Sequence, residues 1–348
     1  MTMKHQVVIK SICIYSLIAT VLMNCDAAPT RLPTKAPTRK PTRAPTTKAP
    51  TKAPTRKPTR APTRKPTTTG WMPGEQKACN FLGMTTVSGC RAMTSFDNYC
   101  GSDDIVGTTI PTEIGLMTQL THLVISFTDM IGGIPASMAL LTGLTHLDLS
   151  FNEFTGTIPS SLSALTKLTF LTFEGQDMVG TIPASLSKLS LLTELIFGVN
   201  KFSGSIPSSF STLNKLTKLD FHQNELAGTI PAALSSLVDM TWLTFHDNAL
   251  IGSIPSSFSS LTSVSYLTFH NNAMTGSVPP SFSALLSLDQ LDLRGNNFSG
   301  TMPADLCSRS PSPPAIYIEC ADIVCGSCCI FYDTTTYTQG NCPDAGAN

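Results

Sequence analysis

Histidine is the residue type in this 348-residue chain whose spacing points most directly to chemistry. Five of the six histidines lie between residues 122 and 270, and His222, His246 and His270 follow one another at intervals of twenty-four residues. Imidazole changes charge near neutral pH and is a common metal ligand, so three aligned rings could bind a metal ion or form a pH-sensitive surface. Which of these two roles is possible depends on how the backbone positions the three imidazole rings.

The sequence carries none of the motifs that support common enzymatic reactions. It has no Gly-x-Ser-x-Gly, no His-Glu-x-x-His, no phosphate-binding loop and no dinucleotide fingerprint. We interpret a histidine beside Asp220 or Asp247 as a chance pairing on a sheet, because it lacks the pocket that catalysis requires. We therefore expect no enzymatic activity and no cofactor.

The histidines belong to a repeat of twenty-four residues. Upstream of each Gly-x-Ile-Pro unit the pattern Leu-x-x-Leu-x-Leu-x-x-Asn recurs, cleanly at Leu144, Leu147, Leu149 and Asn152. Alternating leucines turn every second side chain of a short strand inward, and stacked turns bury them as continuous columns. The prolines that mark the period are Pro111, Pro135, Pro159, Pro183, Pro207, Pro231, Pro255, Pro279 and Pro303.

The polar and turn residues of the repeat have separate roles. The recurrent Asn is expected to turn inward and satisfy backbone groups of neighbouring turns, where an unpaired polar group costs about 1–3 kcal/mol. Thr128 and Gln176 replace this Asn in two repeats, and we expect those turns to be looser or bridged by water. The Gly permits a tight bend, and the Pro begins an irregular or 3₁₀ segment on the convex side.

This repeat resembles that of plant-type leucine-rich-repeat proteins over roughly residues 107–306. Similar arrays form the ectodomains of receptor-like kinases and receptor-like proteins and the secreted inhibitors of polygalacturonase. The resemblance implies an α/β fold, a right-handed leucine-rich-repeat solenoid or horseshoe with a parallel concave β-sheet and a 3₁₀ or irregular convex side. It also implies binding of peptides, proteins or glycans. The chain differs from the receptors because it has no second apolar span and no kinase motif.

The register of the repeat places three columns of outward-facing side chains on the concave strands, each stepping about 4.8 Å per repeat. The first column precedes the second Leu of the pattern, the second lies between the second and third Leu, and the third column follows the third Leu. We predict that the partner binds to side chains of these columns. The predicted ligand-binding residues are Phe170, Glu194, Lys218, Asp220, His222, Trp242, His246, Tyr266, His270 and Arg294.

Two groups in these columns have distinct chemistry. Trp242 and Tyr266 occupy neighbouring rungs of the first column, and such a pair is suited to anchor a peptide or a sugar ring. The three aligned histidines share the third column. A metal site is disfavoured because rungs about 4.8 Å apart are wider than ligands about 2.0–2.1 Å from one zinc ion require, unless the rings lean together. We therefore expect no bound metal. Two interpretations of the aligned histidines are left: a surface residue copied by repeat duplication, or a pH-sensitive binding surface.

The first seventy residues predict export and a spacer. Lys4 and Lys10 precede an apolar run that is too short to cross a bilayer comfortably, so residues 1–27 are predicted to be a signal peptide, with an uncleaved membrane anchor as the alternative. Residues 28–70 are predicted to be a disordered basic Pro/Thr-rich stalk, a tether to an anionic wall polymer or mineral or a plain spacer. We expect a secreted protein, free or associated with a cell wall.

Charge also separates the stalk from the body of the chain. Residues 29–69 hold twelve Lys or Arg and no acid, whereas residues 70–348 hold nine basic and twenty-two acidic side chains. An exported acidic body argues against a nucleic-acid partner. The sequon Asn297-Phe298-Ser299 predicts an N-linked glycan on Asn297.

Cysteines flank the repeats and predict two caps, residues 71–106 and residues 307–348, that cover the ends of residues 107–306. Export makes disulfides the default for the nine cysteines beyond residue 27, and the odd number leaves one free or shared with another chain. Cys325 and Cys328 have the spacing of a redox pair but no strand–helix context, so a cystine is favoured. The disulfide candidates are Cys79, Cys90, Cys100, Cys307, Cys320, Cys325, Cys328, Cys329 and Cys342.

We therefore expect an extracellular leucine-rich-repeat binding module for recognition or adhesion, with a protein, peptide or glycan on its concave face. One alternative is an inhibitor of a wall-degrading enzyme. Another is an ice- or surface-adsorbing protein, which two rows of small hydroxyl residues suggest. These rows are Thr157, Thr181, Ser205, Thr229, Ser253, Ser277 and Thr301, and Thr121, Thr145, Thr169, Thr193, Thr217 and Thr241.

Overall fold

The structure is a computed structural model that describes Phe81 and residues 92–99, 107–308, 314–318, 323–324, 329–333 and 338–341. The chain divides into two compact units, Met1–Lys65 and Pro66–Asn348, and all described residues belong to the second. The predicted signal peptide and stalk lie outside the described residues. So do Cys79, Cys90, Cys100, Cys320, Cys325, Cys328 and Cys342.

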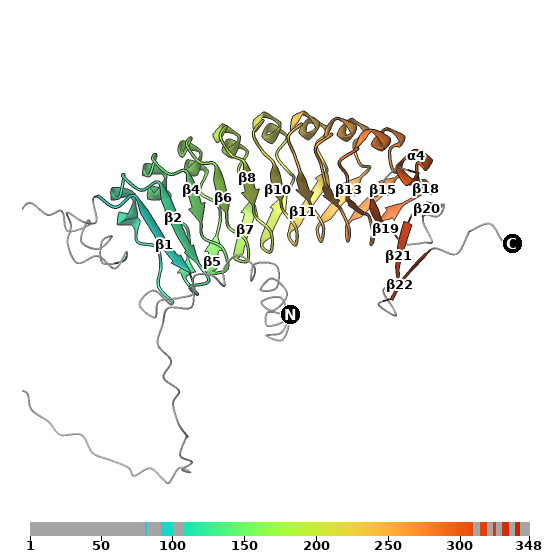
Figure 1. Ribbon diagram of the computed structural model, residues 1–348. Coiled ribbons are helices and arrows are strands. Elements are labelled where there is room, and N and C mark those ends of the chain that lie inside the picture. The colour runs from blue at the N-terminus through green and yellow to red at the C-terminus, as the bar shows by residue number, and fades with distance from the viewer. Residues whose placement is uncertain are drawn as a thin grey trace, which may run out of the picture. The chain divides into compact units, whose positions relative to one another are not determined.

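A long sheet, which we call the concave sheet, contains one strand from each repeat (Figure 1). Its strands pair in parallel and in the register of the repeat, so that Lys218 pairs with Trp242 and Trp242 with Tyr266. The last pairing, β21 with β22, is antiparallel. The predicted parallel sheet is thereby confirmed. In order across the sheet, its strands are β1 (Ser95–Tyr99), β2 (His122–Ser126), β4 (His146–Asp148), β6 (Phe170–Thr172), β8 (Glu194–Ile196), β10 (Lys218–Asp220), β12 (Trp242–Thr244), β14 (Tyr266–Thr268), β16 (Gln290–Asp292), β19 (Ala315–Ile318), β21 (Cys329–Asp333) and β22 (Thr338–Asn341).

Short 3₁₀ helices lie together along another side of the stacked turns (Figure 1). Each begins directly after the recurrent proline, whose φ is −65° at Pro207, because the proline ring sets the backbone for a turn. Each turns one apolar side chain into the core, such as Leu162 in η3 and Phe210 in η5. The predicted convex side is thereby confirmed. The helices are η1 (Thr112–Leu116), η2 (Ala136–Leu140), η3 (Ser160–Ala164), η4 (Ala184–Lys188), η5 (Ser208–Thr212), η6 (Ala232–Ser236), η7 (Ser256–Ser260) and η8 (Pro280–Ala284).

A second sheet, which the sequence analysis did not predict, connects the residues between the recurrent Asn and the Gly-x-Ile-Pro unit. Its strands alternate exposed and buried side chains, as at Lys201 and Phe202. At the bend, Gly180 has φ of +81°, and a Cβ there would lie 2.9 Å from Thr157 Cγ2, so only glycine fits. The strands are β3 (Ile131–Gly132), β5 (Glu153–Gly156), β7 (Asp177–Thr181), β9 (Lys201–Gly204), β11 (Glu225–Thr229), β13 (Ala249–Gly252), β15 (Ala273–Gly276) and β17 (Asn297–Phe298).

The core between these layers is a set of apolar columns that run through successive repeats. The third Leu position of the pattern carries phenylalanine in five consecutive repeats, and these side chains are fully buried. Their rings follow one another at centroid distances from 5.3 Å, for Phe173 and Phe197, to 6.3 Å, for Phe245 and Phe269. Because each turn buries its apolar side against the next, the concave sheet has a rigid support.

The recurrent asparagines satisfy backbone groups as predicted. Asn200 Nδ2 donates to the carbonyls of Phe173, Phe197 and Gly198, and its Oδ1 accepts from the N–H of Met178. These bonds tie each turn to the one before it, since the Phe173 carbonyl belongs to the preceding repeat.

The turn at Gln176 is not looser, and that expectation is wrong, whereas the turn before Thr128 lies outside the described residues. Gln176 Nε2 donates directly to the Leu149 carbonyl, and its Oε1 accepts from the Phe154 N–H at 3.0 Å, because the longer side chain reaches the same groups. The Thr128 hydroxyl is fully buried and donates to Asn152 Oδ1 at 2.6 Å.

The described residues beyond the repeats continue the stack. Helix α4 (Ala304–Cys307) follows Pro303, and Cys307 is disulfide-bonded and packs against the core. Strand β18 (Gly300–Thr301) pairs with β20 (Ile323–Val324). Before the first repeat, Phe81 and Phe96 pack against the same core. No helix among the described residues combines the length and apolar character that a membrane span requires.

Candidate functional site

The three predicted columns occupy the outer side of the concave sheet, but they differ in burial. In the first column, Lys218, Trp242 and Tyr266 are partly exposed, whereas the second column is largely covered by the other two. Asp220 is 7% exposed. Asp220 is therefore a correction to the predicted ligand-binding set, because neighbouring side chains shield it from a partner. Asp220 contacts His222, whose Nδ1 lies 2.6 Å from Asp220 Oδ1.

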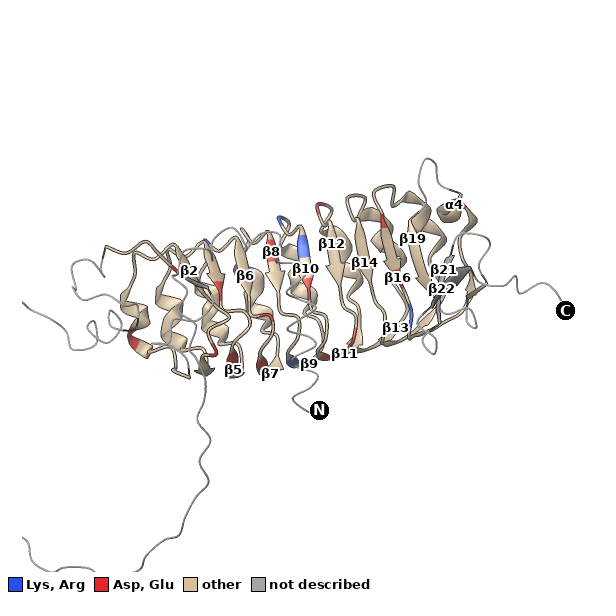
Figure 2. Ribbon diagram, turned by 60° about the horizontal axis from the view of Figure 1, so that its bottom comes forward, with Lys and Arg blue, Asp and Glu red and all other residues tan. Residues whose placement is uncertain are grey.

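Trp242 and Tyr266 form one continuous aromatic surface. Their ring centroids lie 4.3 Å apart with 33° between the planes, and Lys218 Nζ lies 5.4 Å from the Trp242 ring centroid on the other side. Figure 2 shows charged residues on β10, whereas β12 and β14 carry none. The concave face therefore changes from charged side chains on β10 to aromatic side chains on β12, the neighbouring strand of the sheet.

Several polar atoms beneath and within this aromatic surface lack a hydrogen-bond partner among the described residues. They are Trp242 Nε1, Thr244 Oγ1 and Thr268 Oγ1, and all three atoms are buried. Buried polar groups in proteins are nearly always satisfied, so such atoms mark a strained position, a functional one or a place for ordered water. The indole N–H in particular can only donate a hydrogen bond.

The three aligned histidines form a stacked row beside the aromatic pair. The ring centroids of His222 and His246 lie 4.8 Å apart, and those of His246 and His270 lie 4.1 Å apart with 11° between the planes. The His222 ring, which is the first of the row, packs over Gly198 of the preceding repeat. A side chain there would not fit, because a Cβ would lie 2.3 Å from His222 Nδ1.

A carboxylate lies beside each of these imidazoles, and the pairings with Asp220 and Asp247 are direct contacts in the structure. His222 Nδ1 lies 2.6 Å from Asp220 Oδ1, and His246 Nδ1 lies 2.7 Å from Asp247 Oδ2. His270 Nδ1 lies 3.3 Å from Asp292 Oδ2. The side chains of these three histidines are only 15–20% exposed.

Burial and charge act in opposite directions along this row. Burial lowers the pKa of His270 to about 4. Burial also acts to lower the pKa of His222, but its hydrogen bond to Asp220 and the Asp220 charge outweigh this and raise that pKa. Near neutral pH, His270 is therefore neutral, and His222 has the stronger tendency to carry a proton.

Glu174 lies at the N-terminal side of the row, and burial raises its pKa to about 7 against the positive influence of His222. The folded protein therefore holds a proton on Glu174 that the unfolded chain releases near its ordinary pKa of 4.5. Stability contributed by that proton is present below pH 4.5 and is lost as the pH rises through about 7.

Glu174→Gln is accordingly expected to stabilise the protein at pH 8, by up to about 3 kcal/mol from the size of the pKa shift, and to have little effect at pH 4. Thermal unfolding at both pH values measures the difference. Glu153→Gln, at an exposed position of the second sheet, is the control. An equal change in melting temperature at both pH values would contradict the assignment.

The N-terminal part of the concave face carries aromatic side chains that the sequence analysis missed. Phe127 and Phe151 were not in the predicted set, and their ring centroids lie 4.5 Å apart in a stacked arrangement. Phe170, which was predicted, stacks on His146 with ring centroids 4.2 Å apart. Phe127 and Phe151 occupy the position before the recurrent Asn, where the backbone has positive φ and turns the side chain onto the concave face. A phenylalanine at this position in two consecutive repeats is the signal that could have identified them.

The structure brings some of the predicted residues together and separates others. Lys218, His222, Trp242, His246, Tyr266 and His270 lie together on and directly after β10, β12 and β14. Glu194 lies beside Lys218 in the register, and Arg294 is held by two hydrogen bonds to Asp292. Phe170 belongs to the N-terminal aromatic group, and Asn297 is exposed on strand β17 of the second sheet.

Comparison with known proteins adds a family match. The family model of the Leucine Rich Repeat matches residues 143–165, 215–237 and 287–308. No curated protein sequence matches the chain significantly.

Solved structures similar to the chain include two plant receptor ectodomains. The leucine-rich-repeat ectodomain of the plant membrane receptor kinase GASSHO1/SCHENGEN3 from Arabidopsis thaliana, in complex with CASPARIAN STRIP INTEGRITY FACTOR 2, has 30% sequence identity and a TM-score of 0.60 over 64% of this chain and 26% of that chain. The ectodomain of the Arabidopsis receptor kinase HAESA, in complex with an N-terminally extended IDA peptide hormone ligand, has 31% identity and a TM-score of 0.55 over 61% of this chain and 36% of that chain. The chain thus spans well under half the length of either receptor chain.

A plant ice-binding protein is also similar, with 31% identity and a TM-score of 0.49 over 56% of this chain and 63% of that chain.

Proposed function

From the premise that this chain is a leucine-rich-repeat solenoid of the plant type, we propose that it is an extracellular, non-catalytic module that captures a peptide or protein on its concave face. The binding surface, which we call the aromatic anchor, is Trp242 and Tyr266 with Lys218 beside them. The observation that carries the proposal is the partly exposed pair of Trp242 and Tyr266, whose rings form one aromatic surface on the outer side of the concave sheet.

The chemistry of the aromatic anchor indicates the kind of group it binds. An aromatic pair offers a large rigid apolar contact, and Trp and Tyr are enriched at binding hot spots for this reason. The Lys218 ammonium, 5.4 Å from the Trp242 ring centroid, would attract a negative charge of the ligand beside the indole. A peptide with an apolar side chain next to a carboxylate fits these requirements.

The similarity to receptor ectodomains supports a peptide or protein as the partner, since HAESA was solved with a peptide hormone. Export of the chain, the stalk of residues 28–70 as a tether, the disulfide caps and a glycan on Asn297 are parts of the same proposal. A glycan as the ligand is an alternative that a binding assay with oligosaccharides would distinguish.

Trp242→Ala is expected to weaken capture of the partner at least about 30-fold, because truncation of an aromatic hot spot costs about 2 kcal/mol or more. The measurement compares the affinity of wild-type and variant chains for a partner isolated from extracellular material. Ile251→Ala is the matched control, because Ile251 is a large apolar side chain, 51% exposed, on the second sheet. Equal affinity of wild type and Trp242→Ala would refute the proposed surface.

Adsorption to ice or to a mineral is the second candidate, and one observation favours it. The predicted hydroxyl row from Thr157 to Thr301 is exposed in every repeat along the second sheet. The other row contributes less, because its hydroxyls donate to backbone carbonyls of the preceding turn, as Thr193 does to Thr169 at 2.9 Å. Thermal hysteresis of the purified protein tests this candidate, and an assay with a wall-degrading enzyme tests inhibition.

A further inference from the structure

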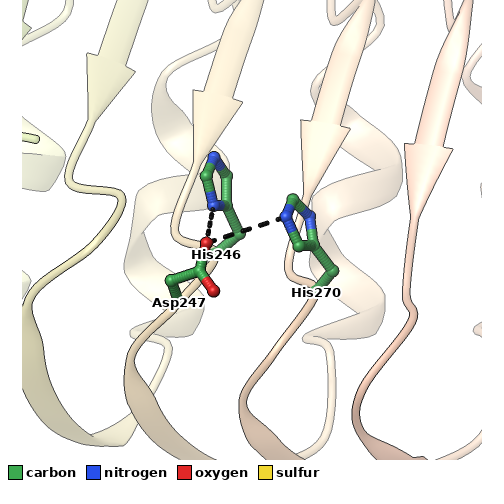
Figure 3. Close-up of side chains that lie close together, drawn as sticks. All are labelled: His246, Asp247 and His270. Carbon is green, nitrogen blue, oxygen red and sulfur yellow. Dashed lines mark hydrogen bonds and ion pairs between the residues drawn. The ribbon is translucent and has the colours of Figure 1, made fainter. Parts of the chain in front are cut away.

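His246, Asp247 and His270 form a cluster of possible metal ligands on the concave face (Figure 3). One ligand atom from each residue can be chosen so that all three lie within 4.8 Å of one another. Asp247 Oδ2 is the shared point, 2.7 Å from His246 Nδ1 and 3.9 Å from His270 Nε2. Two neighbouring repeats therefore direct two imidazoles toward one carboxylate oxygen.

These distances fit a single metal ion after small side-chain movements. Two ligands about 2.0–2.1 Å from a tetrahedral zinc ion lie about 3.3 Å apart, between the two distances observed. The spacing of about 4.8 Å between rungs does not keep the two imidazoles from sharing one ion, because the His246 and His270 rings lean together to a centroid distance of 4.1 Å. Asp247 also adds a ligand that the column of histidines alone does not contain.

Surrounding side chains orient the cluster. Asn271 Nδ2 donates to Asp247 Oδ1 at 2.7 Å, which leaves Oδ2 for the imidazoles. Asp292 Oδ2 lies 3.3 Å from His270 Nδ1, without the alignment of a hydrogen bond, and Nε2 of the same ring lies 3.9 Å from Asp247 Oδ2. Metal-ligating histidines in proteins almost always donate their other ring N–H to a carboxylate, a backbone carbonyl or water, and Asp292 is the nearby carboxylate that could accept from His270.

The local charge also suits a cation. The carboxylates of Asp220, Asp247 and Asp292 lie along the histidine row, and Arg294 is the guanidinium held by Asp292. A divalent ion at the cluster would therefore meet net negative charge at short range in a partly buried setting, where electrostatic attraction is stronger than in water.

We propose that His246, Asp247 and His270 bind one divalent first-row transition metal ion, such as Zn²⁺, through two imidazole nitrogens and one carboxylate oxygen. Two imidazoles and a carboxylate suit these metals rather than Ca²⁺ or Mg²⁺, which prefer oxygen ligands. Three protein ligands leave a coordination position for water or for an oxygen donor of a bound partner. The site is independent of the proposed peptide binding, because it requires no partner.

Calorimetric titration of the full chain with Zn²⁺, after treatment with a chelator, tests the site. The wild type is expected to bind one more equivalent than the double variant His246→Gln/His270→Gln, whose affinity at this site should be at least about 100-fold weaker. Comparison between variants cancels any zinc bound elsewhere on the chain. His146→Gln is the matched control, because His146 lies on the same face and stacks on Phe170.

A second variant keeps the test independent of folding defects. Asn271→Ala leaves all three ligands and is expected to weaken zinc binding about 10-fold through loss of the Asp247 hydrogen bond. Unchanged melting temperatures without metal would confirm that the variants fold. Zinc binding by the double variant that equals the wild type, or no binding by the wild type, would overturn the proposal. Trp242→Ala should retain the metal, so failure of the peptide proposal is distinguishable.

Discussion

Phe221→Ala is expected to lower the free energy of unfolding by about 4 kcal/mol, because it removes a fully buried ring from the middle of the repeat array. Phe221 contacts rings in both neighbouring turns, with centroids 5.7 Å from Phe197 and 6.0 Å from Phe245. It also meets Phe210 of helix η5 edge-on at 6.3 Å. The cavity would thus open between the concave sheet and the 3₁₀ layer, where backbone on both sides limits collapse.

Urea unfolding followed by circular dichroism measures this loss. Phe221→Leu is the matched control, since other repeats carry leucine at the same position, as at Leu149 and Leu293. We expect the leucine variant to lose less than about 1.5 kcal/mol. A loss for Phe221→Ala as small as that of the leucine variant would contradict the assignment, because it would show that no costly cavity opens.

Asn152→Ala is expected to lower the free energy of unfolding by about 3 kcal/mol or more. Asn152 is 7% exposed, and its Nδ2 donates to the carbonyls of Ile125, Leu149 and Ser150. Its Oδ1 accepts from Thr128 and from the Met130 N–H. Alanine would leave several of these buried groups unsatisfied, and each such group costs about 1–3 kcal/mol.

The same unfolding measurement, with Asn214→Ala as the control, tests this prediction. Asn214 is exposed in the turn after η5, and its replacement should change stability by less than about 0.5 kcal/mol. If Asn152→Ala is as stable as the control, the asparagine ladder does not hold the turns together.

The fold was predictable because it follows from a sequence repeat of twenty-four residues. A single period determines which leucines face inward, which strands pair and where each proline begins a 3₁₀ helix. The second sheet was not predicted, because residues such as Thr155 and Val179 show no strong strand pattern and gain their hydrogen bonds only from the neighbouring turns. Gln176 was wrongly expected to loosen its turn, because the reach of a side chain depends on the three-dimensional positions of its partners.

The candidate site was predictable to the level of columns. The sequence places Trp242 beside Tyr266 and His246 beside His270, since register alone determines those neighbours. It does not reveal that Asp220 is buried, because that depends on how His222 folds over it. The lean of the imidazoles toward Asp247 was likewise not predictable, because it arises from hydrogen bonds such as that of Asn271.

Photo-crosslinking tests the central claim, that the concave face captures an extracellular partner, most directly. A benzophenone amino acid replaces Tyr266 in one full-length chain and Ile251, on the second sheet, in another. Each chain is irradiated with the same extracellular material, and the adducts are identified by mass spectrometry. The account predicts a defined adduct from position 266 and none from position 251. An adduct of equal or greater yield from position 251, or none from position 266, would contradict it.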